Sequence, residues 1–401
     1  MSIKHWVWLA SASGVGPVTA AHLLRRFGTP EKVFFADKEE LRNTEGVKSH
    51  DLSALDRKNI AAADKILASC DEIECSVITL QDAQYPERLR NIYDPPIVLY
   101  IRGKLPIIDE EAVIGVVGTR KCTPYGLTTA EDLGYNLARR GILVVSGLAK
   151  GVDAAAMRGA LRGGGRVIGV IGSGLNVVYP PENKKLYEDV CVAGAIISEY
   201  PPGTPPLSQN FPARNRILSG VSIGVAVLES PKRSGALITA ARALEQGRDV
   251  FAMPGNVGAK SCEGSNSLLR EGAIPILSAD DIASEYAELF PDRIIWEDSG
   301  NQSDQRNHLQ KEIDKKPQVE YIDKGVILSN LTGDEKTVAE AIGSSTMHTD
   351  EIIISSNLNA QRVLAALTML ELKGYAKRNG GVWQLTIDNG QFTDGRHCFY
   401  V

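Results

Sequence analysis

The middle of the chain alternates between short apolar runs and helical patterns, and this alternation restricts the fold more than any other feature. Runs that are apolar throughout belong to strands of a parallel sheet covered on both faces. The sequence therefore predicts an α/β domain with a doubly wound sheet, whose ligand crevice lies beyond the C-terminal ends of its strands. The predicted strands are residues 113–117, 142–146, 167–171, 195–198, 223–228, 250–252 and 274–277.

The segments that flank this domain have other patterns. Residues 1–72 predict a domain of short helices, and Gly14-Val15-Gly16 precedes one of them at 18–27. A Gly-Val-Gly turn that opens a helix is either a helix-hairpin-helix contact to a phosphate or a tight turn, and the residues leave both open. Residues 75–103 predict two strands with a turn-rich connector, and we assign 73–290 to the α/β domain.

The C-terminal part predicts a linker and a third domain. Residues 291–324 include a polar stretch rich in Gly, Asn, Ser, Asp and Gln, which is typical of a linker. Residues 325–387 then predict three helices followed by a hairpin that turns at Asn379-Gly380. Three helices with a two-stranded wing indicate a winged-helix domain.

Charge is distributed unevenly along the chain. The 401 residues carry a formal net charge of −5, yet residues 113–277 hold 18 Lys and Arg against 12 Asp and Glu. Because affinity for nucleic acid rests largely on neutralising phosphates, a polyanion is expected to bind this domain. An ordinary solvated surface is the other interpretation.

The cysteine content and the N-terminal sequence indicate the cellular compartment of the protein. The six cysteines are scattered, without a Cys-x-x-Cys pair, which argues against a disulfide framework and a zinc site and fits a reducing cytoplasm. The N-terminus lacks the pattern of a signal peptide, and no apolar stretch approaches 18 residues. We therefore expect a cytoplasmic protein with no membrane partner and no metal.

One short segment indicates the chemistry. Residues 211–216, Phe-Pro-Ala-Arg-Asn-Arg, combine an aromatic ring, an amide and two arginines. Guanidinium groups bind phosphate in a bidentate manner, and a ring beside them can stack on a base. Residues 113–277 contain no histidine, so the usual proton shuttle is missing. The segment suits holding a phosphate backbone better than cleaving it.

Glycines and cations also follow the predicted strand ends. Gly118, Thr119 and Arg120 follow the first strand, and Lys150 lies in the loop after the second. Ser234 and Gly235 open a helix after the fifth. Such glycines let the backbone approach a ligand, and helix N-termini direct N–H groups at an anion. These loops are therefore predicted to contact phosphate.

Cofactor and catalytic signatures are incomplete. The first loop lacks the Gly-x-Gly-x-x-Gly of a dinucleotide site, and no Gly-Lys-Ser/Thr closes a Walker A loop, so we expect no cofactor. The serines have no histidine to act as a base, and the acids are not paired at a diagnostic spacing. Asp153 opens a helix, where a capping role is the simpler interpretation. We expect no enzymatic activity.

Eight motifs, in order along the chain, resemble those of the bacterial DNA-processing protein A (DprA/Smf) family. They are Val-Gly-Thr-Arg at 117–120, Ser-Gly-Leu-Ala-Lys-Gly-Val-Asp at 146–153, Gly-Ser-Gly-Leu-Asn-Val-Val-Tyr-Pro at 172–180, Ile-Ser-Glu-Tyr-Pro at 197–201, Phe-Pro-Ala-Arg-Asn-Arg at 211–216, Arg-Ser-Gly-Ala-Leu-Ile-Thr at 233–239, Gln-Gly-Arg-Asp-Val-Phe-Ala-Met-Pro-Gly at 246–255 and Gly-Ser-Asn-Ser-Leu-Leu-Arg-Glu-Gly-Ala at 264–273. One departure is Met157, where the family pattern leads us to expect histidine. The flanking segments resemble a sterile-alpha-motif-like domain and a winged helix.

The resemblance implies a single-stranded DNA binding protein on an extended Rossmann-like fold. Such proteins protect incoming DNA during natural transformation, load a RecA-type recombinase onto it, and act as homodimers. By position, the implied contacts to the DNA backbone include Gly118, Thr119, Arg120, Lys184, Arg214 and Arg216. Together with the residues singled out above, the full predicted set is Gly118, Thr119, Arg120, Lys150, Lys184, Tyr187, Phe211, Arg214, Asn215, Arg216, Ser234 and Gly235.

The predicted cations are expected to share one groove, and one alternative function remains open. Because parallel strands bring their loops to one edge of the sheet, we predict that Arg120, Lys184, Arg214 and Arg216 line one groove with Tyr187 in it. Internal pairing of an arginine with Glu199 or Glu229 is the competing structural interpretation. The alternative function is a nucleotide-processing enzyme that hydrolyses a nucleoside monophosphate, since fold alone does not separate the two.

Overall fold

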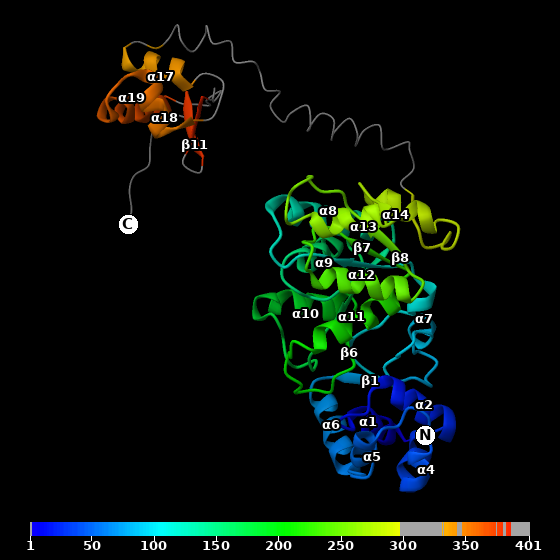
Figure 1. Cartoon of the computed structure of the whole chain (residues 1–401). Helices are drawn as coiled ribbons and strands as arrows, with labels where there is room; N and C mark the ends of the chain where they lie inside the picture. Colours follow the sequence, from blue (N-terminus) through cyan, green and yellow to red (C-terminus); the bar gives the residue numbers. More distant parts are fainter. Residues whose placement is uncertain are drawn as a thin grey trace. The chain divides into compact units, whose positions relative to one another are not determined.

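The computed structural model describes residues 2–296, 331, 333–342, 347–373, 375–379 and 382–385. These residues belong to two compact units, Met1–Glu297 and Asp298–Val401 (Figure 1). Most of the predicted linker, 297–324, lies outside the described residues. The proposed boundaries at residues 72, 290 and 324 remain predictions.

A nine-stranded sheet organises the first unit, in the order β1-β2-β6-β5-β4-β3-β7-β8-β9. The pairs β1–β2 and β2–β6 are antiparallel, and the other neighbours are parallel. The strands are β1 Cys75–Thr79, β2 Val98–Gly103, β3 Val113–Val117, β4 Leu143–Ser146, β5 Val167–Val170, β6 Ala195–Ser198, β7 Gly224–Val227, β8 Asp249–Ala252 and β9 Ile274–Pro275. All seven strands predicted between residues 113 and 277 are present, which confirms the α/β prediction.

The strand order contains a switch point. From β3 the chain builds the sheet outward through β4, β5 and β6, and then returns to place β7 on the other side of β3. In a doubly wound sheet, ligands bind beyond the C-terminal ends of the strands at such a reversal. The loops after β3 and β7 are therefore the structural position for a site.

Helices cover both faces of the sheet, and alternate strand residues point to opposite layers (Figure 1). Ile114 and Val116 of β3 belong to one core cluster, whereas Val113 and Val117 belong to the other. The helices that pack into the first cluster are α8 Pro124–Arg139, α9 Val152–Arg162, α10 Lys184–Ala193 and α14 Ala279–Tyr286. Those of the second are α7 Glu87–Arg90, α11 Asn210–Val221, α12 Gly235–Glu245 and α13 Glu263–Arg270. Met157 of α9 is fully buried in the first cluster, so this position is used for packing.

The N-terminal helices share a core with the sheet. They are α1 Ile3–Ser11, α2 Pro17–Phe27, α3 Pro30–Phe35, α4 Lys38–Arg42, α5 Ser49–Leu55 and α6 Ile60–Glu72. Trp6 and Leu9 of α1 are buried in the same cluster as Tyr100 of β2. The predicted helix at 18–27 is confirmed as α2, which follows Gly16 and begins at Pro17. Proline at this position is favoured because its missing N–H would have no partner.

The second unit has the predicted winged-helix elements. Its helices are α17 Asp334–Ile342, α18 Thr349–Ser356 and α19 Ala360–Leu372, and its strands are β10 Met347–His348, β11 Ala376–Asn379 and β12 Val382–Leu385. The Asn359 side chain caps α19 by accepting from the Arg362 N–H at 3.0 Å. β11 and β12 pair antiparallel as the expected wing, and β10 pairs with β12. A core that includes Val338, Leu367 and Trp383 holds the unit together.

Candidate nucleic-acid interface

A cleft of about 840 Å³ lies at the switch point. One wall follows β3, with Gly118, Thr119, Arg120 and Lys121. The opposite wall follows β7, with Pro231, residues 233–236, Ile238 and Thr239. The floor includes Arg214 of α11, and Lys260 reaches the cleft from the loop before α13. The site therefore lies where the doubly wound topology predicts it.

The loop after β3 is held in place by the end of β7. The Thr119 N–H donates to the Glu229 carbonyl oxygen at 2.7 Å, and the buried Glu229 carboxylate accepts from the Thr123 N–H at 2.9 Å. Gly118 is required because a Cβ there would collide with the Val152 side chain at the start of α9. These contacts fix the backbone, and Arg120 and Lys121 remain exposed. The loop is preorganised to present two cations.

The N-terminus of α12 forms the facing wall. The Ser234 hydroxyl caps the helix by accepting from the Ala236 N–H at 3.2 Å, and Asn215 of α11 donates to the Gly235 carbonyl oxygen at 3.3 Å. Gly235 has open space around its Cα, and Arg233 is exposed beside it. A helix N-terminus carries partial positive charge and free N–H groups, so this wall favours an anion.

Arg214 is a buried cation beneath the cleft. Its Nη1 donates to the Val170 carbonyl oxygen at 2.7 Å, and its Nε has no hydrogen-bond partner among the described residues. The guanidinium packs against Gly147, where any Cβ would collide with it. Burial lowers the pKa of Arg214 to about 10, although nearby Asp153 opposes the shift. At neutral pH this side chain is still charged, with an unused donor.

Asp153 lies in the same buried region. Its Oδ2 accepts from the Gly147 N–H at 3.1 Å, so the carboxylate fixes the loop after β4 rather than capping its own helix. Burial raises the pKa of Asp153, while Arg214 and the backbone N–H groups of Gly118 and Gly147 act to lower it. The pair of Asp153 and Arg214 therefore joins the loops after β3 and β4 to α11 beneath the cleft.

Two aromatic rings lie in the cleft beside Arg120. The Arg120 guanidinium carbon is 5.4 Å from the Phe211 ring centroid, within the range of a cation–π contact. The Tyr179 ring lies 5.7 Å from Phe211 with an interplanar angle of 32°. Cationic and aromatic groups are thus adjacent, as they are in sites that bind single-stranded nucleic acids.

The structure brings only part of the predicted groove together. Of the five residues named for it, Arg120 and Arg214 line the cleft, and Lys184, Tyr187 and Arg216 do not. Lys184 is exposed at the start of α10. Lys150, also predicted to bind, is exposed outside the cleft lining and pairs with Glu182 at 2.5 Å. The other predicted residues, Gly118, Thr119, Phe211, Asn215, Ser234 and Gly235, all line it.

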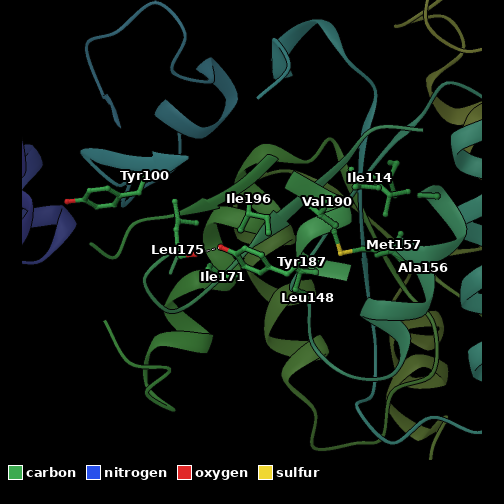
Figure 2. Packing of buried hydrophobic residues seen from close by; sticks show 14 of the residues in the cluster. Tyr100, Ile114, Leu148, Ala156, Met157, Ile171, Leu175, Tyr187, Val190 and Ile196 are labelled. Atoms are coloured by element: carbon green, nitrogen blue, oxygen red, sulfur yellow. Dashed lines mark hydrogen bonds between the residues drawn. The ribbon is translucent and has the colours of Figure 1, made fainter. Parts of the chain in front are cut away.

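The prediction that Tyr187 lies in the groove is wrong. Its side chain is only 3% exposed and packs in the core beside Leu148 and Val190 (Figure 2). Its hydroxyl donates to the Leu175 carbonyl oxygen at 2.5 Å, and burial raises its pKa. The helical spacing of Leu186, Tyr187 and Val190 turns this face of α10 toward the sheet, where no base can reach the ring.

Arg216 also has an internal role, which corrects its assignment to the groove. Its Nη1 and Nη2 donate to the two Glu199 carboxylate oxygens at 3.0 and 2.7 Å, and its Nε lies 3.1 Å from Asp94. Burial alone would lower the pKa of Arg216, but Glu199 and Asp94 outweigh it and the pKa is raised. The side chain is 4% exposed and faces a second hollow of about 490 Å³, between α11 and the turn before α2.

Among the lining residues that sequence reasoning missed are three cations and one aromatic ring. They are Lys121, Tyr179, Arg233 and Lys260. Lys121 follows Arg120 directly, and Arg233 precedes the predicted helix start. Both lie just after a predicted strand, so their position in the sequence could have predicted that they line the cleft. Tyr179 and Lys260 lie in irregular loops, where no periodicity shows which way a side chain points. Only tertiary packing brings them to the cleft.

The described residues contain neither a metal site nor a membrane-spanning helix. In residues 2–296 and the described parts of the second unit, no group of three or more His, Cys, Asp or Glu side chains is arranged to hold a metal ion. Within the same residues, no helix combines the length and apolar character needed to cross a membrane.

Comparisons with known proteins agree with one another. A family model described as DNA recombination-mediator protein A matches residues 76–287, and a DprA winged helix domain matches 327–381. Protein Smf of Synechocystis sp. is 32% identical over 399 residues, covering 94% of this chain and 97% of that protein. DNA processing protein DprA of Bacillus subtilis is 42% identical over 224 residues, covering 56% and 75%. The X-ray structure of DNA processing protein A from Streptococcus pneumoniae matches with a TM-score of 0.63 and 33% identity, covering 71% and 99%.

Proposed function

Because the chain belongs to the DNA-processing protein A (DprA/Smf) family, we propose that it binds single-stranded DNA in the cleft at the switch point. The phosphate backbone contacts the loop after β3 and the N-terminus of α12, and Arg214 supports it from below. Unpaired bases contact the aromatic side of the cleft. Neither type of contact reads base edges, so binding is largely indifferent to sequence.

One observation carries this proposal. Four exposed cations from three different loops, Arg120, Lys121, Arg233 and Lys260, converge on one cleft. Just outside it, Lys150 and Arg242 are each paired with a glutamate, whereas these four have no carboxylate partner among the described residues. Cations gathered without counter-charges repel one another, and a polyanion relieves that repulsion. One small anion would not need so many.

The wider role is proposed on family grounds. A recombination mediator protects incoming single strands during natural transformation and transfers them to a RecA-type recombinase, acting in the cytoplasm as a homodimer. It does so without catalysis. The competing function, hydrolysis of a nucleoside monophosphate, would use the same edge of the sheet. It would also need an acid or base free to act on a substrate, and Asp153, which lines the cleft, is engaged by the Gly147 N–H and by the charge of Arg214.

A titration tests the proposal. Fluorescent oligo-dT and a duplex of equal length are titrated with the full chain at two salt concentrations. We expect the single strand to bind more tightly and its affinity to fall with salt, because binding releases counterions. Equal affinity for the duplex contradicts the proposal, and so does hydrolysis of nucleoside monophosphates at rates typical of enzymes.

The winged-helix unit is expected to contribute little to this affinity. Arg362 of its third helix and Lys373, which follows that helix, already pair with Asp334 and Glu335 at 2.7 Å or less. We therefore predict that a chain ending at Trp296 keeps its affinity for single strands within about tenfold, or about 1.4 kcal/mol. Anisotropy titration measures this, with circular dichroism as the folding control. A larger loss in a folded truncation would place the second unit in the DNA site.

A further inference from the structure

Tyr179 is an exposed ring on a well-held loop. Its side chain is 43% exposed, whereas Phe211 next to it is only partly exposed and Tyr187, eight residues later, is buried. It lies between β5 and the short 3₁₀ helix Pro181–Asn183. An exposed ring that lines a polar cleft is a candidate contact for a ligand.

The loop that carries Tyr179 is fixed by hydrogen bonds. The Ser173 hydroxyl donates to the Val177 carbonyl oxygen at 3.1 Å, and the Gly174 N–H donates to the Thr204 carbonyl oxygen at 2.9 Å. The Asn176 side chain accepts from the Gly203 N–H at 2.6 Å. The first bond lies within the loop, and the other two join it to Thr204 and Gly203. The backbone that leads to Tyr179 is therefore held in place, which lowers the entropy lost when the ring binds a ligand.

Tyr179 and Arg120 both contact the Phe211 ring. The Arg120 guanidinium lies 5.4 Å from the Phe211 centroid, and the Tyr179 ring lies 5.7 Å from the same centroid. The cluster around Phe211 therefore combines a cation that can bind phosphate with an exposed ring. A nucleotide carries the same two features, a phosphate and a planar base, in adjacent positions.

We propose that Tyr179 is a base-stacking platform that gives the cleft its preference for single strands. The inference rests on the proposed function and extends it. The cations do not discriminate by themselves, because single strands and duplexes both present phosphates. An unpaired base can turn its face to Tyr179, while a base in a duplex is already stacked on both sides and paired.

The test separates the contribution of the ring from that of charge. Full-length Tyr179→Leu and Tyr179→Phe variants are titrated with labelled oligo-dT and with an abasic oligomer of equal length and charge. Tyr93→Leu is the matched control, since Tyr93 is 85% exposed and does not line the cleft. Each titration is repeated at several salt concentrations, and circular dichroism checks folding.

We expect Tyr179→Leu to weaken binding to oligo-dT about tenfold and to leave binding to the abasic oligomer nearly unchanged. Its salt dependence should match the wild type, because no phosphate contact is lost. Tyr179→Phe should restore the affinity for oligo-dT, and Tyr93→Leu should have no effect.

Equal losses on both oligomers, or no loss on oligo-dT, would overturn the inference and leave Tyr179 as a packing partner of Phe211. A wild-type protein that binds neither oligomer would instead contradict the proposed function itself.

Discussion

Replacing Arg216 by alanine should lower the free energy of unfolding by about 3 kcal/mol, because it leaves the partly buried carboxylates of Glu199 and Asp94 without their cation. Arg216 is 4% exposed, holds both oxygens of Glu199 and also contacts Asp94. Glu199 directly follows β6, and Asp94 lies in the connector before β2. The arginine therefore joins the end of β6 to the segment that leads into β2. Removing it disrupts the whole network.

Chemical denaturation followed by circular dichroism measures this loss. Arg242→Ala is the matched control, since Arg242 is 46% exposed and pairs with Glu245 on the surface, where such pairs contribute about 1 kcal/mol or less. A folded Arg216→Ala variant with unchanged stability but reduced affinity for DNA would contradict this account. It would restore Arg216 to the DNA site.

The largest effect on DNA binding is expected at Arg120. It is exposed, lines the cleft and is held over Phe211. Arg120→Ala should remove one phosphate contact, with a loss of about 1.5–3 kcal/mol or roughly ten- to hundredfold in affinity. The slope of log affinity against log salt should fall by about one phosphate. Arg120→Glu should lose more, because it adds repulsion.

The Arg216 and Arg120 variants should differ in what they lose, stability in the first and affinity for DNA in the second. Arg120→Ala is expected to unfold like the wild type, because exposed side chains away from buried networks contribute little. Arg162→Ala serves as the charge-matched control, since Arg162 is 55% exposed and pairs with Glu131 outside the cleft. An Arg120→Ala variant that keeps full affinity and an unchanged salt slope would exclude the loop after β3 from the site.

Much of the fold was predictable because burial on both sheet faces leaves a direct record in the sequence. A run such as residues 113–117 is apolar throughout because Val113 and Val117 face one core and Ile114 and Val116 face the other. The positions of Arg120 and Gly235 then followed from topology, since parallel strands place their loops at one edge. The antiparallel edge formed by β1, β2 and β6 was not predicted, because strand order there depends on long-range pairing.

Side-chain direction explains the errors in the site. Arg216 lies on a helix that lines the cleft but points away from it, to Glu199, and Tyr187 points into the core, to Leu175. On a helix, a shift of one or two residues turns a side chain by about 100–200°, so Arg214 and Arg216 face different surroundings. Tyr179 was missed for the same reason, because its direction depends on a loop without periodicity.

Photo-crosslinking tests the central claim, that the cleft at the switch point holds the single strand. The full chain is irradiated with a 4-thiothymidine oligomer, and the crosslinked peptides are identified by mass spectrometry. We expect crosslinks in the segments that line the cleft, around residues 118–121, 179, 206–218 and 231–239, and their loss when unlabelled oligo-dT competes. Crosslinks confined to the N-terminal helices or to the winged-helix unit would contradict the account.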